Sequence, residues 1–170
     1  MLPAEIAPAD LVHTAHLPLA DVALRLGTAA LLGLMLGLNR ELRGKAAGLR
    51  THTLLSVSAA VATLVALELY YDLGSDGQGN PPDPIRAIQG VAQAIGLICA
   101  GIIIQGRGTR VRNLTTAATL WMAASLGLAC GAGLYGIALL SGGIALALLL
   151  TLSVVERRFF GDKEEEDATD

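Results

Sequence analysis

Five long apolar stretches constrain the fold of this chain more than any other feature. They cover residues 19–38, 53–70, 87–104, 114–129 and 134–155, and each approaches the roughly 20 residues that an α-helix needs to cross a bilayer. Only 16% of the residues are charged, against about 25% in soluble domains. Because backbone groups in lipid must be hydrogen-bonded internally, and because the stretches lack the alternation of barrel strands, helices are the expected structure. The sequence predicts an all-α polytopic bundle with five transmembrane helices.

Positive charge is concentrated in three of the segments outside these stretches. Residues 37–53, 105–113 and 156–170 hold ten of the twelve Lys and Arg residues. Since cytoplasmic segments of membrane proteins retain Lys and Arg, we expect these three segments in the cytoplasm and the N-terminus outside. The chain then divides into an extracytoplasmic tail (1–18), a membrane domain (19–155) and a charged cytoplasmic tail (156–170).

The two basic loops share a plan that favours anion binding. Each carries three arginines and ends in threonines where the next helix begins, so positive helix ends and arginines face the same side. One interpretation is a surface for anionic lipid or an acidic segment of a partner; the alternative is that the arginines are topology signals and the Thr and Asn residues are N-caps. The candidate surface consists of Arg40, Arg43, Arg50, Arg107, Arg110 and Arg112.

Small residues recur at four-residue spacing in the first and fourth stretches, a pattern that lets helix backbones approach closely. The alternative is the general frequency of glycine in membrane helices. The predicted packing positions are Gly33, Gly37, Gly96, Gly101, Gly127 and Gly131.

A few polar side chains interrupt the apolar stretches. Asp21 and Arg25 are four residues apart and are expected to pair. Gln89 and Gln93 are expected to face other helices, with a polar path as the alternative. His52 is interpreted as a helix-end residue, and Arg40 as an anchor at the membrane surface or a partner of the opposite loop.

The sequence shows no arrangement of residues typical of a catalytic site. No nucleophile–base pair or metal-ligand spacing is evident, and the carboxylates that a cation-coupled carrier needs are missing from the middle of the stretches. We therefore expect no enzyme activity, no cofactor, no metal site and no nucleic-acid partner. Cys99 and Cys130 are placed at different depths, so we expect two free thiols.

Four segments, in order, resemble one family. They are GLMLGLNRE (33–41), AGLRTHT (47–53), GLICAG (96–101) and NLTTAATLW (113–121), and over about residues 21–155 the chain is similar to the MgtC/SapB family of bacterial inner-membrane proteins. The family-motif residues are Asn39, Glu41, Thr51, His52, Thr115, Thr116, Trp121 and Cys130.

The resemblance implies a function as well as a fold. Some relatives are linked to growth under magnesium limitation and survival inside host cells, and act by regulating other membrane proteins. Only the membrane domain is covered, without the cytosolic C-terminal domain of some members. We rank a regulatory or partner-binding protein of the inner membrane first, with a small transporter or channel for magnesium or another ion as the alternative. The expected partners are the bilayer, anionic lipid, another membrane protein and a second copy of the chain.

Overall fold

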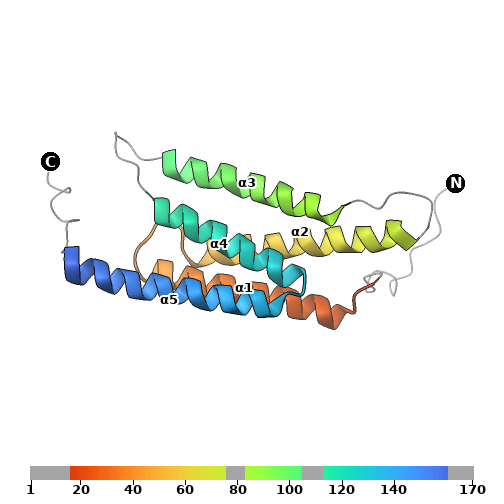
Figure 1. The fold of residues 1–170 in the computed structure, drawn as a ribbon, viewed down its shortest axis with the longest axis horizontal. Coiled ribbons are helices and arrows are strands. Elements are labelled where there is room, and N and C mark those ends of the chain that lie inside the picture. The colour runs from red at the N-terminus through yellow and green to blue at the C-terminus, as the bar shows by residue number, and fades with distance from the viewer. Residues whose placement is uncertain (1–15, 76–82, 105–112, 161–170) are drawn as a thin grey trace.

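The computed structural model describes residues 16–75, 83–104 and 113–160, and over these residues it is entirely helical (Figure 1). All five described helices are long and apolar enough to cross a membrane, which confirms the predicted all-α membrane fold. The helices are α1 (Leu19–Glu41), α2 (Leu49–Ser75), α3 (Pro84–Ile104), α4 (Leu114–Gly131) and α5 (Tyr135–Phe160).

The helices extend beyond the apolar stretches that predicted them. α2 begins at Leu49 instead of residue 53 and runs to Ser75, while α5 runs past residue 155 to Phe160. Hydropathy marks the part of a helix that lies in lipid, but helical hydrogen bonding continues through polar residues outside it. Most of the sequence motif at 47–53 is therefore the first turn of α2 and not a loop.

Two residues proposed as N-caps do not cap their helices. Thr53 lies inside α2, where its hydroxyl donates to the Leu49 carbonyl at 2.8 Å. Asn113 precedes α4 with a left-handed backbone (φ 64°) and makes no side-chain cap hydrogen bond. The prediction of side-chain capping at these two residues was wrong, because the helix starts lie elsewhere or are held differently.

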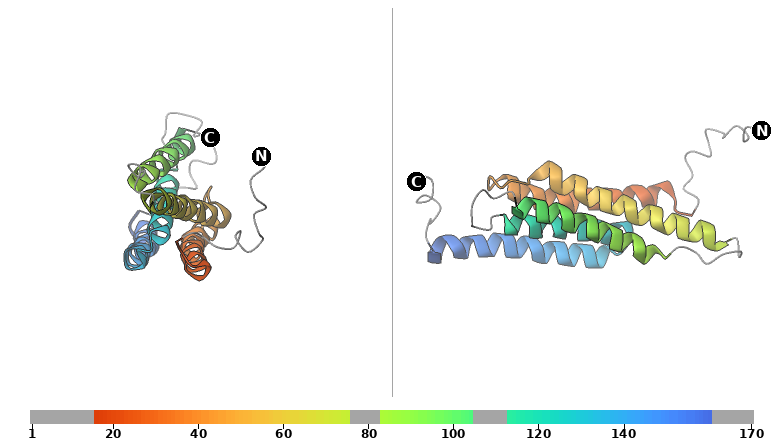
Figure 2. Two further views of the ribbon diagram at one scale, coloured as in Figure 1. Left: turned by 90° about the vertical axis from the view of Figure 1, so that its right-hand side faces the viewer. Right: turned by 90° about the horizontal axis from the view of Figure 1, so that it is seen from above.

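α2 and α4 form the centre of the bundle. α2 packs against α1, α3 and α4, whereas α4 packs against all four other helices, and α4 is the most buried of the five spans. Seen along the bundle, α3 lies on one side of this pair, and α1 and α5 lie on the other (Figure 2). Each of the outer helices α1, α3 and α5 therefore has one side that faces away from the bundle.

Glycines bring the backbones of α1 and α4 into contact with α2 from two sides. A Cβ atom added to Gly33 of α1 would lie 2.8 Å from the His52 carbonyl oxygen, and one added to Gly37 would lie 2.7 Å from the Leu49 Cα atom. On the other side, a Cβ atom on Gly127 of α4 would overlap the Ser56 carbonyl group. No side chain fits at these contacts.

The remaining predicted packing glycines divide into two groups. A Cβ atom at Gly131 of α4 would lie 2.6 Å from the Ala60 carbonyl oxygen, again too close for a side chain. At Gly96 it would make only an ordinary 3.7 Å contact with Trp121, and at Gly101 it would meet no described atom within 4 Å. The expectation of close packing was wrong for Gly101, because this residue lies on the outward face of α3.

The turn between α4 and α5 is held by α1. Gly133 has a positive φ of 76°, and its N–H donates to the Cys130 carbonyl while the Leu134 N–H reaches back to Ala129, an arrangement that closes the end of α4. Arg25 donates to the Gly131 carbonyl at 2.8 Å, which places a positive charge at the negative end of the helix dipole. The predicted pair of Arg25 and Asp21 is confirmed, with N–O distances of 2.8 and 2.9 Å.

The first basic segment lies at one end of the molecule, where several helices begin or end. α1 ends, and α2 and α4 begin, at the same end of the bundle, where α5 also ends (Figure 1). We call this the basic end; it carries Arg40, Arg43 and Arg50 of the described residues. Its location in the cytoplasm stays a prediction from the charge distribution.

The sidedness is testable with single cysteines at exposed positions. In right-side-out vesicles, we expect a membrane-impermeant maleimide to label Asp83→Cys, at the start of α3, and to label Ala46→Cys only after permeabilisation. The unchanged chain is the control, since Cys99 and Cys130 are buried. Labelling of both new cysteines from the same side would contradict the arrangement.

The glycine contacts predict a strong dependence on position within α1. Gly33→Ala forces a methyl group against the backbone of α2 and should lower the free energy of unfolding by about 1–3 kcal/mol. Gly27→Ala is the matched control, because a Cβ atom there meets no described atom within 4 Å, and its effect should stay within about 0.5 kcal/mol. Thermal unfolding in detergent measures both; equal stability of the two variants would refute the packing argument.

Candidate functional site

A buried polar network lies where α1, α2 and α4 meet near the basic end. It joins side chains from three helices that are distant in sequence, and most of the members are fully enclosed. The buried polar residues of the described chain are Arg40, His52, Ser56, Thr63, Thr116 and Thr119.

Arg40 points into the bundle. It is only 3% exposed, and its Nη2 donates to the Thr116 hydroxyl of α4 at 2.7 Å. The expectation of a surface anchor was wrong, because Arg40 follows the buried residues Leu36 and Gly37 at helical spacing and therefore shares their inward face. Thr116 occupies the first turn of α4, so this bond ties the end of α1 to the start of α4.

His52 bridges the centre of the network. It is fully buried, with Nδ1 2.8 Å from the Gly48 carbonyl oxygen and Nε2 3.1 Å from the Thr119 hydroxyl. Since the carbonyl oxygen can only accept, Nδ1 carries a hydrogen. The Thr119 hydroxyl beside Nε2 donates to the Thr116 carbonyl at 2.9 Å. His52 lies in the first turn of α2, as expected of a helix-end residue, and it also links α2 to α4.

Ser56 continues the network one turn further along α2. Its hydroxyl donates to the Ala29 carbonyl of α1 at 2.8 Å. Ser56 and Thr119 were not among the predicted site residues. A signal for Ser56 existed, because His52, Ser56 and Thr63 recur at helical spacing on one face of α2. Polar residues on the small-residue face of a membrane helix are expected to bond between helices.

Glu41 fills the anion position at the start of α2. Its carboxylate accepts the Leu49 N–H at 3.0 Å, and a Cβ atom on Gly48 would overlap this carboxylate. The negative charge thus lies at the positive end of the α2 dipole. One of the two interpretations of this loop placed an external anion at the helix start, but an acid of the chain already occupies that position.

The six arginines of the proposed surface do not share one environment. Arg43 is half-buried and Arg50 is exposed, as is the neighbouring Thr51. Arg40 faces inward, so it does not belong to an exposed surface. Arg107, Arg110 and Arg112 lie outside the described residues.

The other family-motif residues lie in different environments. Cys130 is fully buried between helices, Trp121 is 46% exposed, and Thr115 is exposed in the first turn of α4. Asn39 is half-buried, and its Oδ1 atom is enclosed without a hydrogen-bond partner in the described chain.

Both cysteines are free thiols, in agreement with the predicted register. Cys99 of α3 is buried and donates to the Ala117 carbonyl of α4 at 3.3 Å, while Cys130 is at the far end of α4.

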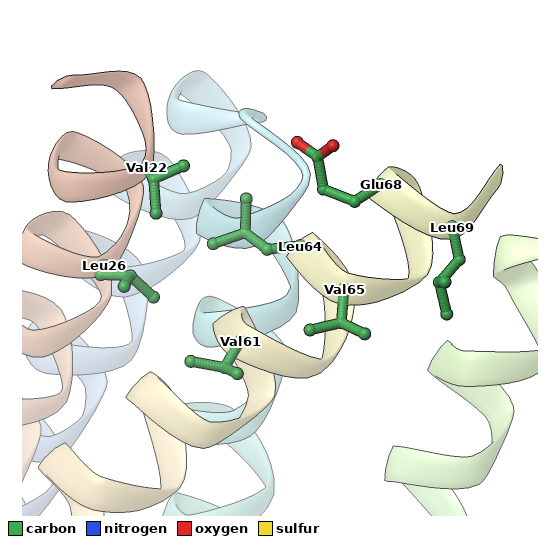
Figure 3. A pocket seen from close by; sticks show the side chains of 7 residues that line it. All are labelled: Val22, Leu26, Val61, Leu64, Val65, Glu68 and Leu69. Atoms are coloured by element: carbon green, nitrogen blue, oxygen red, sulfur yellow. The ribbon is translucent and has the colours of Figure 1, made fainter. Parts of the chain in front are cut away.

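The opposite end of the bundle holds an apolar pocket of about 280 Å³ between α1 and α2 (Figure 3). Its only charged lining residue, Glu68, accepts hydrogen bonds from the backbone N–H groups of His16 and Leu17. The Nδ1 atom of His16 also lies 3.3 Å from Glu68 and 3.5 Å from Asp72. Within the described residues, no three His, Cys, Asp or Glu side chains are grouped to hold a metal ion.

Comparison with known proteins agrees with this architecture. The model of the MgtC family matches residues 26–158, nearly the whole membrane domain. The chain belongs to the MgtC family. No solved structure matches it.

Relatives in this family differ in length from the chain. The protein SapB of Bacillus subtilis is 36% identical over 146 residues, which make up 86% of this chain and 62% of SapB. The protein SrpB of Synechococcus elongatus is 38% identical, with 86% of this chain and 82% of SrpB covered. The protein MgtC of Brucella abortus is 41% identical over 69% of this chain, but only 45% of MgtC is matched.

The central bridge predicts a clear contrast between two adjacent residues of α2. His52→Ala removes two hydrogen bonds and leaves a cavity, so we expect the free energy of unfolding to fall by about 1–3 kcal/mol. Thr51→Ala is the control, because Thr51 is exposed one residue away. Thermal unfolding of both variants measures the difference; a stable His52→Ala protein would show that the network contributes little.

Proposed function

We propose that this multi-pass protein of the MgtC family binds another protein of the bacterial inner membrane through the outward face of α3, and regulates it. The proposal includes a role in growth at low magnesium, which the family resemblance implies. One observation carries it: Gln93 is exposed near the middle of a predominantly apolar membrane span.

The position of Gln93 follows from the packing of α3. Ile95 and Cys99 are buried and belong to the same core cluster as Leu120 of α4. Gln93 precedes Ile95 by two residues, so it projects from the opposite side of the helix. It follows Pro84, the first residue of α3, by nine residues, which places it about 14 Å along the helix.

A primary amide facing lipid at this depth is costly. Transfer of an amide into hydrocarbon without a hydrogen bond costs roughly 4–8 kcal/mol, and neither Gln93 nor Gln89, one turn earlier, has a hydrogen-bond partner among the described residues. Gly90 and Ala94 are exposed beside them and would allow a second helix to approach closely. A transmembrane helix with polar side chains of its own matches this face.

A partner of different sequence is the occupant that we propose. The family resemblance implies regulation of other membrane proteins, and that requires contact with them in the membrane. A second copy of the chain is the competing occupant, because the same face on two copies would also satisfy the glutamines.

A photo-crosslinking amino acid at Ala94 tests the proposal in cells. We expect an adduct larger than the chain whose second component, identified by mass spectrometry, is a different membrane protein. The matched position is Leu140, which is 69% exposed on α5 and is expected to face lipid. The same adduct from Leu140 would mean non-selective contact, and an adduct of two copies would identify a homo-oligomer instead.

The functional arm uses Gln93→Leu, which leaves the inward face of α3 unchanged. We expect this variant to fold, to lose most of the Ala94 adduct, and to fail to restore growth at low magnesium in a strain lacking the protein. Restoring the activity of the identified partner in proteoliposomes with the parent chain, but not with Gln93→Leu, would establish regulation. Full function of Gln93→Leu would overturn the role of this face.

A further inference from the structure

Arg40 carries a buried positive charge without a counter-charge in the described chain. Arg40 forms no ion pair with a described residue, in contrast to Arg25 and His16. Its Nε atom is enclosed and has no hydrogen-bond partner in the part of the chain that the structure describes. An arginine that is only 3% exposed normally has an anionic partner, because moving an unpaired charge from water into the interior costs several kcal/mol of free energy.

The groups around Arg40 do not neutralise its charge; they add to the positive electrostatic potential. Its guanidinium lies against Thr116, in the first turn of α4, where the helix dipole presents its positive end. This turn contains no acidic residue, and Asn113 provides no side-chain cap. Arg43, one turn beyond Arg40 and half-buried, brings a further positive charge to the same end.

At the start of α2, the positive helix end is neutralised by an acidic residue of the chain. At α2, Glu41 accepts the Leu49 N–H and supplies the negative charge. That carboxylate is committed to α2, and no equivalent acid of the described chain lies at α4. The two helix starts therefore differ in one respect: one has an anion from the chain, and the other has a buried arginine that still requires one.

We propose that Arg40 and the first turn of α4 bind a phosphate group. The guanidinium presents several N–H donors in a plane, which matches phosphate oxygens. The Thr116 hydroxyl accepts from Arg40 and can donate its own proton, and the first amides of a helix have no helical acceptor. This site is independent of the α3 face and of any partner bound there.

Two sources supply this chemistry at a membrane surface: the phosphate of an anionic lipid, and free phosphate from solution. Thermal unfolding separates them. In one arm, the protein in neutral detergent is titrated with inorganic phosphate against sodium chloride of equal ionic strength. In the other, nanodiscs of phosphatidylcholine are compared with nanodiscs containing phosphatidylglycerol.

The parent chain should gain stability in at least one arm, and Arg40→Gln should lose at least about tenfold in apparent affinity there. Arg50→Gln is the matched control: it removes one charge from the same end, but Arg50 is exposed, so its response should match the parent chain. A response to inorganic phosphate identifies a free anion, and a response to phosphatidylglycerol alone identifies a lipid headgroup.

Equal responses of Arg40→Gln and the parent chain, equal effects of chloride and phosphate, or no response in either arm would each overturn the site. If Arg40→Gln does not fold, Thr116→Val decides the question. It keeps the charge of Arg40 and removes the hydroxyl, so it should weaken the response severalfold; an unchanged response would refute the proposal.

Discussion

The close approach of α1 and α4 to α2 is the constraint on which the rest of the structure depends. At Gly33 and Gly127 the neighbouring backbones leave no space for even a methyl group. Lipid offers no hydrophobic drive for helices to associate, so contact energy must come from backbone packing and hydrogen bonds. Glycine at these positions makes both available, because backbones in contact bring short polar side chains within bonding distance.

The buried polar network is a consequence of this geometry. Serine and threonine hydroxyls are short, and the 2.8 Å bond from Ser56 to the Ala29 carbonyl exists only because α1 and α2 nearly touch. On the other side of α2, the Nε2 atom of His52 lies 3.1 Å from the Thr119 hydroxyl of α4. Arg40, the longest member, reaches the start of α4 and brings a charge into a place where the described residues supply no acid. A scaffold built for close packing thereby becomes a candidate anion site.

The outer helices meet a different environment from the inner pair. α5 exposes apolar residues such as Leu140 and Ile144, which suits contact with acyl chains. α3 also lies outside, but its exposed face includes Gln93 at the depth of the bilayer core. Lipid does not satisfy hydrogen-bonding groups. This rule suits the first face to lipid and is the reason for our proposal that the second face contacts a protein partner.

Much of the architecture could be predicted from local sequence. The length of the apolar stretches predicted the helices, because the bilayer thickness sets that length. The four-residue spacing of small residues predicted the packing positions Gly33, Gly37, Gly127 and Gly131. The i, i+4 spacing predicted the pair of Asp21 and Arg25. These properties depend on residues near one another in the chain. Helix ends were less accurate, since hydropathy does not report helical turns outside the membrane.

The environment of the charged and polar residues was decided only by tertiary structure. In sequence, Arg40 and Arg50 are equivalent basic loop residues, yet the rotation of α1 about its axis buries one, and the position of α2 exposes the other. Likewise, Glu41 caps α2 and His52 reaches Thr119 because distant segments meet. Local sequence determined which segments are helices in lipid; which side chains share the interior depended on how those helices pack.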